Sequence, residues 1–182
     1  INILNSAIEI LSPQAKPWGV TINMNDYVTA ARDARKTQTT NPQTFSGGEK
    51  GYLGYVMHGH LDRFHLYNHT QHYRFPMPKQ LPKVVLITEY AGSDGGLIKY
   101  AADSGAQGIV IQALGAGNVG IPANKAILYA LTKHIPVVLT YRVPIGSVYP
   151  LYGDIGGSAA LAKHGVILAH DFKGPKARIV LM

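Results

Sequence analysis

An α/β fold in two pieces, the second a Rossmann-like domain built on a parallel sheet, is the fold class that the sequence predicts. The first observation behind it is an alternation of short apolar runs and helical segments in the C-terminal half, which is typical of right-handed crossovers between parallel strands. The second is a proline-rich stretch of low apolar periodicity just before this alternation, which indicates a connection rather than an element. We therefore expect an N-terminal piece at residues 1–68, a linker at 69–82 and a C-terminal piece at 83–182.

The N-terminal piece is expected to hold one helix, a short strand, a long loop and two further strands. A helix is predicted at 2–11 because apolar residues recur there every three or four positions. Residues 19–24 follow a proline-containing break and form a strand candidate. Residues 25–51 are polar and predict a long loop, of a kind that often carries function. Residues 52–67 predict two strands with a turn near Gly59.

The C-terminal piece shows the pattern of strand, helix, strand, helix, strand. Buried strands are predicted at 83–88, 108–113 and 136–141, where the residues are almost all apolar. Helices are predicted between them, at 93–105 and at 122–134, the second with a proline near its start. Strands connected in this way lie parallel in one sheet.

The composition excludes several classes of site. The sequence holds no cysteine, so disulfides, thiolate nucleophiles and cysteine-ligated metals are ruled out. No apolar run reaches the roughly 20 residues of a membrane-spanning helix, so we expect no membrane partner. The net charge of +7 could attract nucleic acid, and a basic nucleic-acid binder remains an alternative. Because the basic residues are scattered, a solvated surface is favoured and no nucleic-acid partner is expected.

Three glycines follow the strand predicted at 108–113 with the spacing G-x-G-x-x-G: Gly115, Gly117 and Gly120. This spacing is typical of dinucleotide-binding turns, which place an acidic residue at the end of the next strand. Here the next strand ends near Arg142. An arginine at this place would suit only the 2′-phosphate of NADP. A tight strand-to-helix turn is therefore favoured, and an NADP-binding oxidoreductase is a minor alternative.

Five histidines lie within fifteen residues: His58, His60, His65, His69 and His72. If a strand carries His58 and His60, their side chains share a face and could bind a metal as a pair. Asp62 is the lone carboxylate nearby. Structural or surface histidines are favoured, and no metal is expected.

The loop predicted at 25–51 contains Arg32, Asp33, Arg35 and Lys36, followed by several threonines. A lysine that is crowded by cations and partly buried loses its proton more readily, and it can then accept one from a hydroxyl nucleophile. On the residues alone, an exposed basic loop is the favoured interpretation, and Lys36 is the catalytic candidate if the loop has a function.

The same loop and its flanks resemble the L-asparaginase/glutaminase family, in its type II form. In that family a strand ending in Met-Asn-Asp leads to a loop of the form Ala-Arg-x-x-x-Lys-x-Asn-Thr-Thr, followed by Thr/Ala-Phe and Gly-x-Leu-Gly. Residues 81–94, 105–120 and 174–182 resemble the family's C-terminal domain, including its Gly-x-Gly-Asn turn, which binds no dinucleotide. The positions matching the loop motifs are Met24, Asn25, Asp26, Ala31, Arg32, Lys36, Thr39, Thr40, Phe45, Gly51, Leu53 and Gly54.

This resemblance implies an amidohydrolase that converts L-asparagine to aspartate and ammonia, with L-glutamine as a further substrate. It implies a threonine nucleophile, an acyl-enzyme and a catalytic role for Lys36, and it identifies no substrate-binding residue here. It implies neither cofactor nor metal, and a homotetramer built from intimate dimers. The first residues lack the features of a signal peptide, but the type II form favours a periplasmic or secreted location over a cytoplasmic one.

The sequence also departs from the family pattern. The threonine motifs Gly-Gly-Thr-Ile and His-Gly-Thr-Asp-Thr do not occur in it, so we expect an internal to C-terminal fragment that is inactive alone. Arg35 replaces the usual small residue before Lys36, and Gln38 replaces an asparagine. The family's Asn and Glu lent by a neighbouring subunit correspond to Gly92 and to a stretch whose acidic residue is Asp154. A non-catalytic asparaginase-like relic or partner-binding module remains the alternative.

Overall fold

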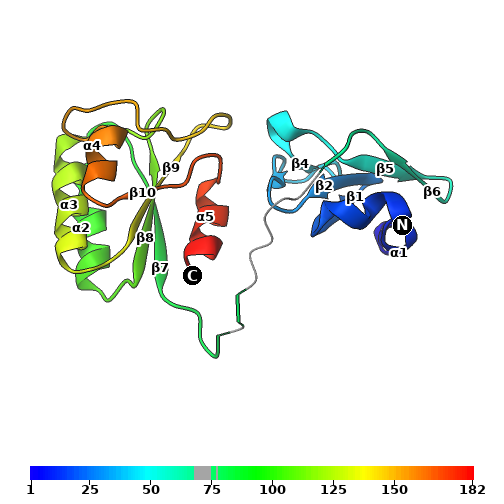
Figure 1. Cartoon of the computed structure of the whole chain (residues 1–182), viewed down its shortest axis with the longest axis horizontal. Coiled ribbons are helices and arrows are strands. Elements are labelled where there is room, and N and C mark those ends of the chain that lie inside the picture. Colours follow the sequence, from blue (N-terminus) through cyan, green and yellow to red (C-terminus); the bar gives the residue numbers. More distant parts are fainter. Residues whose placement is uncertain (68–74, 77) are drawn as a thin grey trace. The chain divides into compact units, whose positions relative to one another are not determined.

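Two compact units make up the chain, Ile1–Pro76 and Met77–Met182 (Figure 1). The computed structural model describes residues 1–67, 75–76 and 78–182, so residues 69–74 and 77 of the predicted linker lie outside the described part. Both units combine helices with β-sheet, which confirms the α/β fold class. Among the described residues, none of the helices has the length and apolar character needed to cross a membrane.

The first unit combines one α-helix with a four-stranded antiparallel sheet. α1 (Asn2–Leu11) confirms the predicted helix, and a short 3-10 helix, η1 (Pro13–Trp18), follows it. The sheet has the order β1-β2-β5-β6, and its core gathers Trp18, Val28 and Leu53. Its strands are β1 (Thr21–Met24), β2 (Tyr27–Ala30), β5 (Gly54–Met57) and β6 (His60–Arg63).

The prediction of one long loop at 25–51 is wrong for part of its length. Asn25 and Asp26 both have positive φ, 50° and 69°, and they join Met24 to its partner Tyr27 in a two-residue hairpin. Asn and Asp tolerate this conformation better than most residues, so the polar pair that suggested a loop is a tight turn. The segment therefore contains β2, β3 (Arg35–Lys36), β4 (Phe45–Ser46) and the 3-10 helix η2 (Gly48–Lys50).

The second unit contains the predicted parallel sheet, with the order β10-β9-β8-β7. β8 (Gly108–Ala113) begins and ends at the predicted residues, and β7 (Val84–Thr88) and β9 (Val137–Tyr141) each begin one residue later than predicted. The predicted helices are also present, as α2 (Gly96–Asp103) and α3 (Ile121–Thr132). Beyond residue 142 the unit adds α4 (Ser158–Lys163), the two-residue β10 (Ile167–Leu168) and α5 (Gly174–Leu181).

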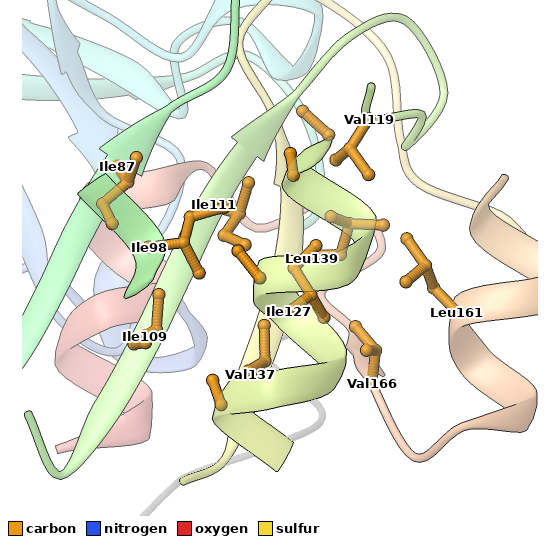
Figure 2. Close-up of a cluster of buried hydrophobic side chains, with 14 of the residues drawn as sticks. Ile87, Ile98, Ile109, Ile111, Val119, Ile127, Val137, Leu139, Leu161 and Val166 are labelled. Atoms are coloured by element: carbon orange, nitrogen blue, oxygen red, sulfur yellow. The ribbon is translucent and has the colours of Figure 1, made fainter. Parts of the chain in front are cut away.

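Two apolar layers cover the two faces of this sheet. Ile109 and Ile111 of β8 join the layer formed with α2 and α3, and Figure 2 shows these side chains meeting Ile98, Ile127 and Leu139. Because successive strand residues point to opposite faces, Val110 lies in the other layer, with Ala177 of α5. Burial on both faces explains the nearly unbroken apolar runs that predicted the strands.

Candidate active site

Lys36 lies on a small hairpin formed by β3 and β4, where it pairs with Phe45. Its ammonium nitrogen is 6.0 Å from the centroid of the Phe45 ring, a distance at which a cation and an aromatic face attract each other weakly. The side chain is exposed. This exposure agrees with the exposed basic segment that the residues alone favoured, and the partial burial that a catalytic lysine would require is not found among the described residues.

The cationic side chains that lie near Lys36 in the sequence do not crowd around it in the structure. Arg32 is paired with Asp33, with 3.0 Å between nitrogen and oxygen, and the Tyr67 hydroxyl donates to the same carboxylate at 3.1 Å. Arg35 and Lys36 are consecutive in β3, so their side chains point to opposite faces of the hairpin. The Asp33 carboxylate therefore compensates the charge of Arg32, and the alternation of side chains along β3 separates Arg35 from Lys36.

The loop that connects β3 to β4 is closed by hydrogen bonds at its neck. The Thr37 backbone N–H donates to the Thr44 carbonyl at 2.7 Å, and the Thr37 hydroxyl donates to the same oxygen at 3.0 Å. The buried Thr44 hydroxyl accepts from the Gln38 N–H at 3.2 Å and donates to the Gln38 carbonyl at 2.6 Å. Thr39 and Thr40 lie beyond this neck and are exposed. The side chains of Lys36, Thr39 and Thr40 are therefore all accessible to solvent.

The glycine-rich segment after β8 forms a tight turn, as the favoured interpretation held. Gly115 and Gly117 have φ of 48° and 113°, and the Asn118 N–H donates to the Leu114 carbonyl at 2.9 Å. A Cβ atom on Gly117 would lie 2.7 Å from a methyl group of Val148. These glycines are therefore required by the turn and by close packing.

Glu89 also contacts this turn region, and no sequence pattern indicated that it would. Its side chain is fully buried just after β7, and Oε1 accepts a hydrogen bond from the Gly120 N–H at 3.3 Å, at the start of α3. Its other oxygen has no partner among the described residues. A pyrophosphate at this helix start would meet a buried carboxylate, which is a further argument against the dinucleotide alternative.

His58 and His60 do not lie on one strand, so the condition for the metal-pair alternative is not met. His58 has a φ of 50° and forms the turn between β5 and β6 with Gly59, while His60 begins β6. The predicted pair of strands with a turn near Gly59 is confirmed. Across the part of the chain that the structure describes, no three His, Asp or Glu side chains form a group that could hold a metal. His69 and His72 lie outside that part.

Several exposed apolar residues lie on the segments that follow strands of the parallel sheet, and we call this set the sheet-end patch. Tyr90 follows β7, Ile121 begins α3, and the remaining members lie on the connection from β9 to α4. Exposed apolar residues indicate an interaction site where they form a contiguous surface of more than a few hundred Å². Its exposed members are Tyr90, Ile121, Ile145, Tyr149, Leu151, Tyr152 and Ile155.

A charged cluster joins α2 to α3 on the surface of the second unit. Asp103 binds Lys99 at 2.7 Å and accepts from the Tyr129 hydroxyl at 2.7 Å, and it also pairs with Lys133. Hydrogen bonds from Lys133, Lys99 and Tyr129 hold the pKa of Asp103 well below its usual range. The hydrogen bond to Asp103 raises the pKa of both lysines. The cluster therefore fastens α2 to the end of α3.

Two family models match almost the whole chain. The model for the N-terminal domain of asparaginase matches residues 1–69, and the model for the glutaminase/asparaginase C-terminal domain matches residues 83–182.

The chain is similar to curated proteins and to a solved structure. It is 32% identical to an L-asparaginase of Bacillus licheniformis, over 99% of this chain and 55% of that protein. It is 30% identical to L-asparaginase 2 of Escherichia coli, over 99% of this chain and 51% of that protein. A crystal structure of a probable cytoplasmic L-asparaginase from Campylobacter jejuni matches with a TM-score of 0.86 and 30% identity, covering 100% of this chain and 57% of that one. The chain thus spans about half the length of the relatives it matches.

Proposed function

The chain belongs to the glutaminase/asparaginase family, and on this premise we propose that it is part of an amidohydrolase that converts L-asparagine to L-aspartate and ammonia. The observation that carries the proposal is the match of both family models, which together take in residues 1–69 and 83–182. Relatives named L-asparaginase support asparagine as the substrate, and L-glutamine is the proposed second substrate.

The proposed chemistry is acyl transfer to a threonine. A threonine hydroxyl attacks the side-chain amide carbon of asparagine, and its proton passes to the Lys36 amine. The tetrahedral intermediate collapses, the C–N bond breaks, and the leaving nitrogen takes a proton to depart as ammonia. Water then hydrolyses the resulting ester and releases aspartate, returning the proton to the threonine oxygen.

The hairpin of β3 and β4 holds the backbone of Lys36 in a defined place, which supports its proposed role as proton acceptor. The hydrogen bonds between Thr37 and Thr44 fix the two short strands relative to each other. The backbone from which the Lys36 side chain projects therefore has a defined conformation. A lysine accepts a proton only as a neutral amine, which solvent exposure does not favour. We propose that residues outside this chain cover the hairpin and supply the threonine, and that these 182 residues alone do not turn over asparagine.

The sheet-end patch supports the oligomer that the family implies. Seven exposed apolar side chains on the segments after strands of the sheet, including Tyr149 and Leu151, suit burial against another subunit better than contact with water. We propose that these residues form part of a subunit interface in a homotetramer.

The experiment that tests the activity compares the chain with a chimera. The chimera joins the chain to the part of the Bacillus licheniformis relative that lies outside their 181-residue match. We expect ammonia release from L-asparagine by the chimera and none by the chain alone. A folded chimera without activity on asparagine or glutamine would contradict the proposed function. Turnover by the chain alone would instead require a nucleophile among Thr37, Thr39 and Thr40.

A further inference from the structure

The hairpin that carries Lys36 is not joined to the main sheet of its unit by strand pairing. Among the described residues, β3 and β4 pair with each other alone and form a separate two-stranded sheet. The strands β1, β2, β5 and β6 form the four-stranded sheet beside it. Backbone pairing therefore does not set the orientation of the hairpin relative to the four-stranded sheet, and side-chain contacts have to set it.

The side chain of Gln43, in the loop between β3 and β4, makes two hydrogen bonds to other parts of the unit. Its oxygen Oε1 accepts from the side-chain amide of Asn25 at 2.8 Å, in the turn between β1 and β2. Its nitrogen Nε2 donates to the Tyr52 hydroxyl at 3.0 Å, just before β5. Among the described residues, no other hydrogen bond joins residues 35–46 to a distant part of the chain.

The groups on both sides of this contact are themselves held in place. The Gln43 N–H donates to the side-chain oxygen of Asn41 at 2.9 Å, which is an Asx turn that shapes the loop. Asn25 belongs to the two-residue turn with positive φ that joins β1 to β2. The Tyr52 ring lies 4.5 Å from the ring of Tyr27 on β2, measured between centroids. The Gln43 amide therefore connects a shaped loop to two fixed points on the four-stranded sheet.

Lys36 lies next to this contact along the hairpin. It pairs with Phe45, two positions after Gln43. The hydrogen bonds between Thr37 and Thr44 join the two strands between Lys36 and the loop. Because these bonds make the hairpin one piece, a rotation of the hairpin on the sheet would displace the Lys36 amine with it.

We infer that Gln43 is a positioning residue for Lys36. By binding Asn25 and Tyr52, it holds the hairpin, and with it the Lys36 amine, in one orientation relative to the four-stranded sheet. A displacement of a catalytic group by about 1 Å can cost about 10²-fold in rate. Lys36 needs such a fixed place as a proton acceptor, so the inference rests on the proposed function.

Backbone order parameters from ¹⁵N relaxation test the first step on the chain itself, without any substrate. Gln43→Ala should lower the order parameters of residues 36–44 from the range of rigid backbone, about 0.85, toward that of flexible backbone, below about 0.6. The matched control is Gln107→Ala, which removes an exposed glutamine that accepts from the Lys83 N–H at 3.0 Å in the second unit. Order parameters that Gln43→Ala leaves unchanged would overturn the inference.

Two substitutions of Asn25 separate the hydrogen bond from the turn. Asn25→Gly keeps the turn, because glycine adopts a positive φ freely, but it removes the donor and should lower the same order parameters. Asn25→Asp tolerates the turn as well and offers an acceptor. The Gln43 amide can meet this acceptor by turning over, so that its oxygen faces the Tyr52 hydroxyl, and the order parameters should stay at their original values. Two variants that behave alike would overturn the inference.

The chimera tests whether the orientation of the hairpin matters to the reaction. Gln43→Ala should lower kcat for L-asparagine by about three- to tenfold and change KM by less than about twofold, since a proton acceptor acts mainly in the transition state. Tyr52→Phe should lower kcat as well. Its matched control is Tyr55→Phe, which should not, because the Tyr55 hydroxyl makes no hydrogen bond to the described residues, although its ring also lies near Tyr27.

The two kinds of measurement distinguish this inference from the proposed function. A hairpin that becomes mobile in Gln43→Ala while kcat of the chimera stays unchanged would overturn the inference, because the orientation would then not matter to Lys36. A chimera that releases no ammonia in any form would contradict the proposed function. The order parameters of the chain would still decide whether Gln43 sets the orientation of the hairpin.

Discussion

Glu89 places a carboxylate in the interior of the second unit, where it links the end of β7 to the start of α3. Oε1 accepts from the Gly120 N–H, which is one of the helix-start donors that have no partner within the helix. The positive end of the helix dipole also favours a carboxylate there. The sequence could not indicate this role, since a lone Glu after an apolar strand carries no pattern, and the contact spans 31 positions.

Glu89→Ala should lower the free energy of unfolding by about 1–3 kcal/mol, because it removes the acceptor and leaves a small cavity. Glu89→Gln keeps the size of the side chain and an oxygen acceptor, so it should cost less. Urea denaturation of the two variants measures the difference. Equal stability of Glu89→Ala and the original chain would show that the contact does not contribute.

The Asp103 cluster should give the second unit a measurable dependence on pH. The pKa of Asp103 is lowered in the folded chain by hydrogen bonds from Lys133, Lys99 and Tyr129. A carboxyl with a lowered pKa stabilises the fold fully above its unfolded pKa of about 3.9, and this contribution is lost as the pH falls toward the folded value. Asp103→Asn should therefore lower the Tm at pH 7, with a difference that shrinks below about pH 4.

Asp154→Asn is the control for this measurement. Asp154 is exposed and lies in the same unit, outside the cluster. Melting curves of both variants between pH 3 and pH 8 check the prediction. A Tm difference for Asp103→Asn that stays constant over this range would rule out the charge as its cause.

Among the elements, the turn between β8 and α3 depends on Gly117 more than on Gly115. A Cβ atom at Gly117 would meet Val148, Ser158 and Leu139 side chains, the first at 2.7 Å, while one at Gly115 would meet nothing within 4 Å. Both residues have positive φ. Gly115→Ala should cost about 1–2 kcal/mol from backbone strain alone, and Gly117→Ala should cost more, because overpacking adds to the strain.

Thermal and urea unfolding of the two glycine variants decide this prediction. Equal losses of stability would mean that Val148 moves aside at no cost. The spacing of the glycines was visible in the sequence, but it could not show which glycine is packed against a distant residue.

Elements of the parallel sheet could be predicted because each is buried on both faces. β7, β8 and β9 are short apolar runs bounded by turn residues, so their predicted bounds agree with the structure to within one residue. The hairpin of β1 and β2 was missed because its turn, Asn25 and Asp26, is polar like the loop around it. β3, β4 and β10 have two residues each, too few for any periodic pattern.

For the whole molecule, the sequence predicted the family and the candidate residue but not the surroundings of that residue. The motif around Lys36 identified its segment, and both family models match the chain. The exposure of Lys36 agrees with the basic loop that the residues alone favoured, but the short strands β3 and β4 and the pairing of Arg32 with Asp33 could not be predicted. They depend on strand geometry and on a contact with Tyr67, 34 positions further along the chain.

The central claim is that Lys36 accepts the proton of the nucleophile in the complete enzyme. The most direct measurement is the kcat for ammonia release from L-asparagine by the chimera carrying Lys36→Met. A general base contributes about 10²–10⁴-fold in rate, so kcat should fall by about that factor, while KM changes less. Lys36→Arg should not restore the rate, because a guanidinium keeps its proton. Lys125→Met, an exposed lysine on α3, should leave kcat nearly unchanged. If Lys36→Met folds normally and keeps the original kcat, the claim is contradicted, and the hairpin of β3 and β4 is an exposed basic segment without a catalytic role.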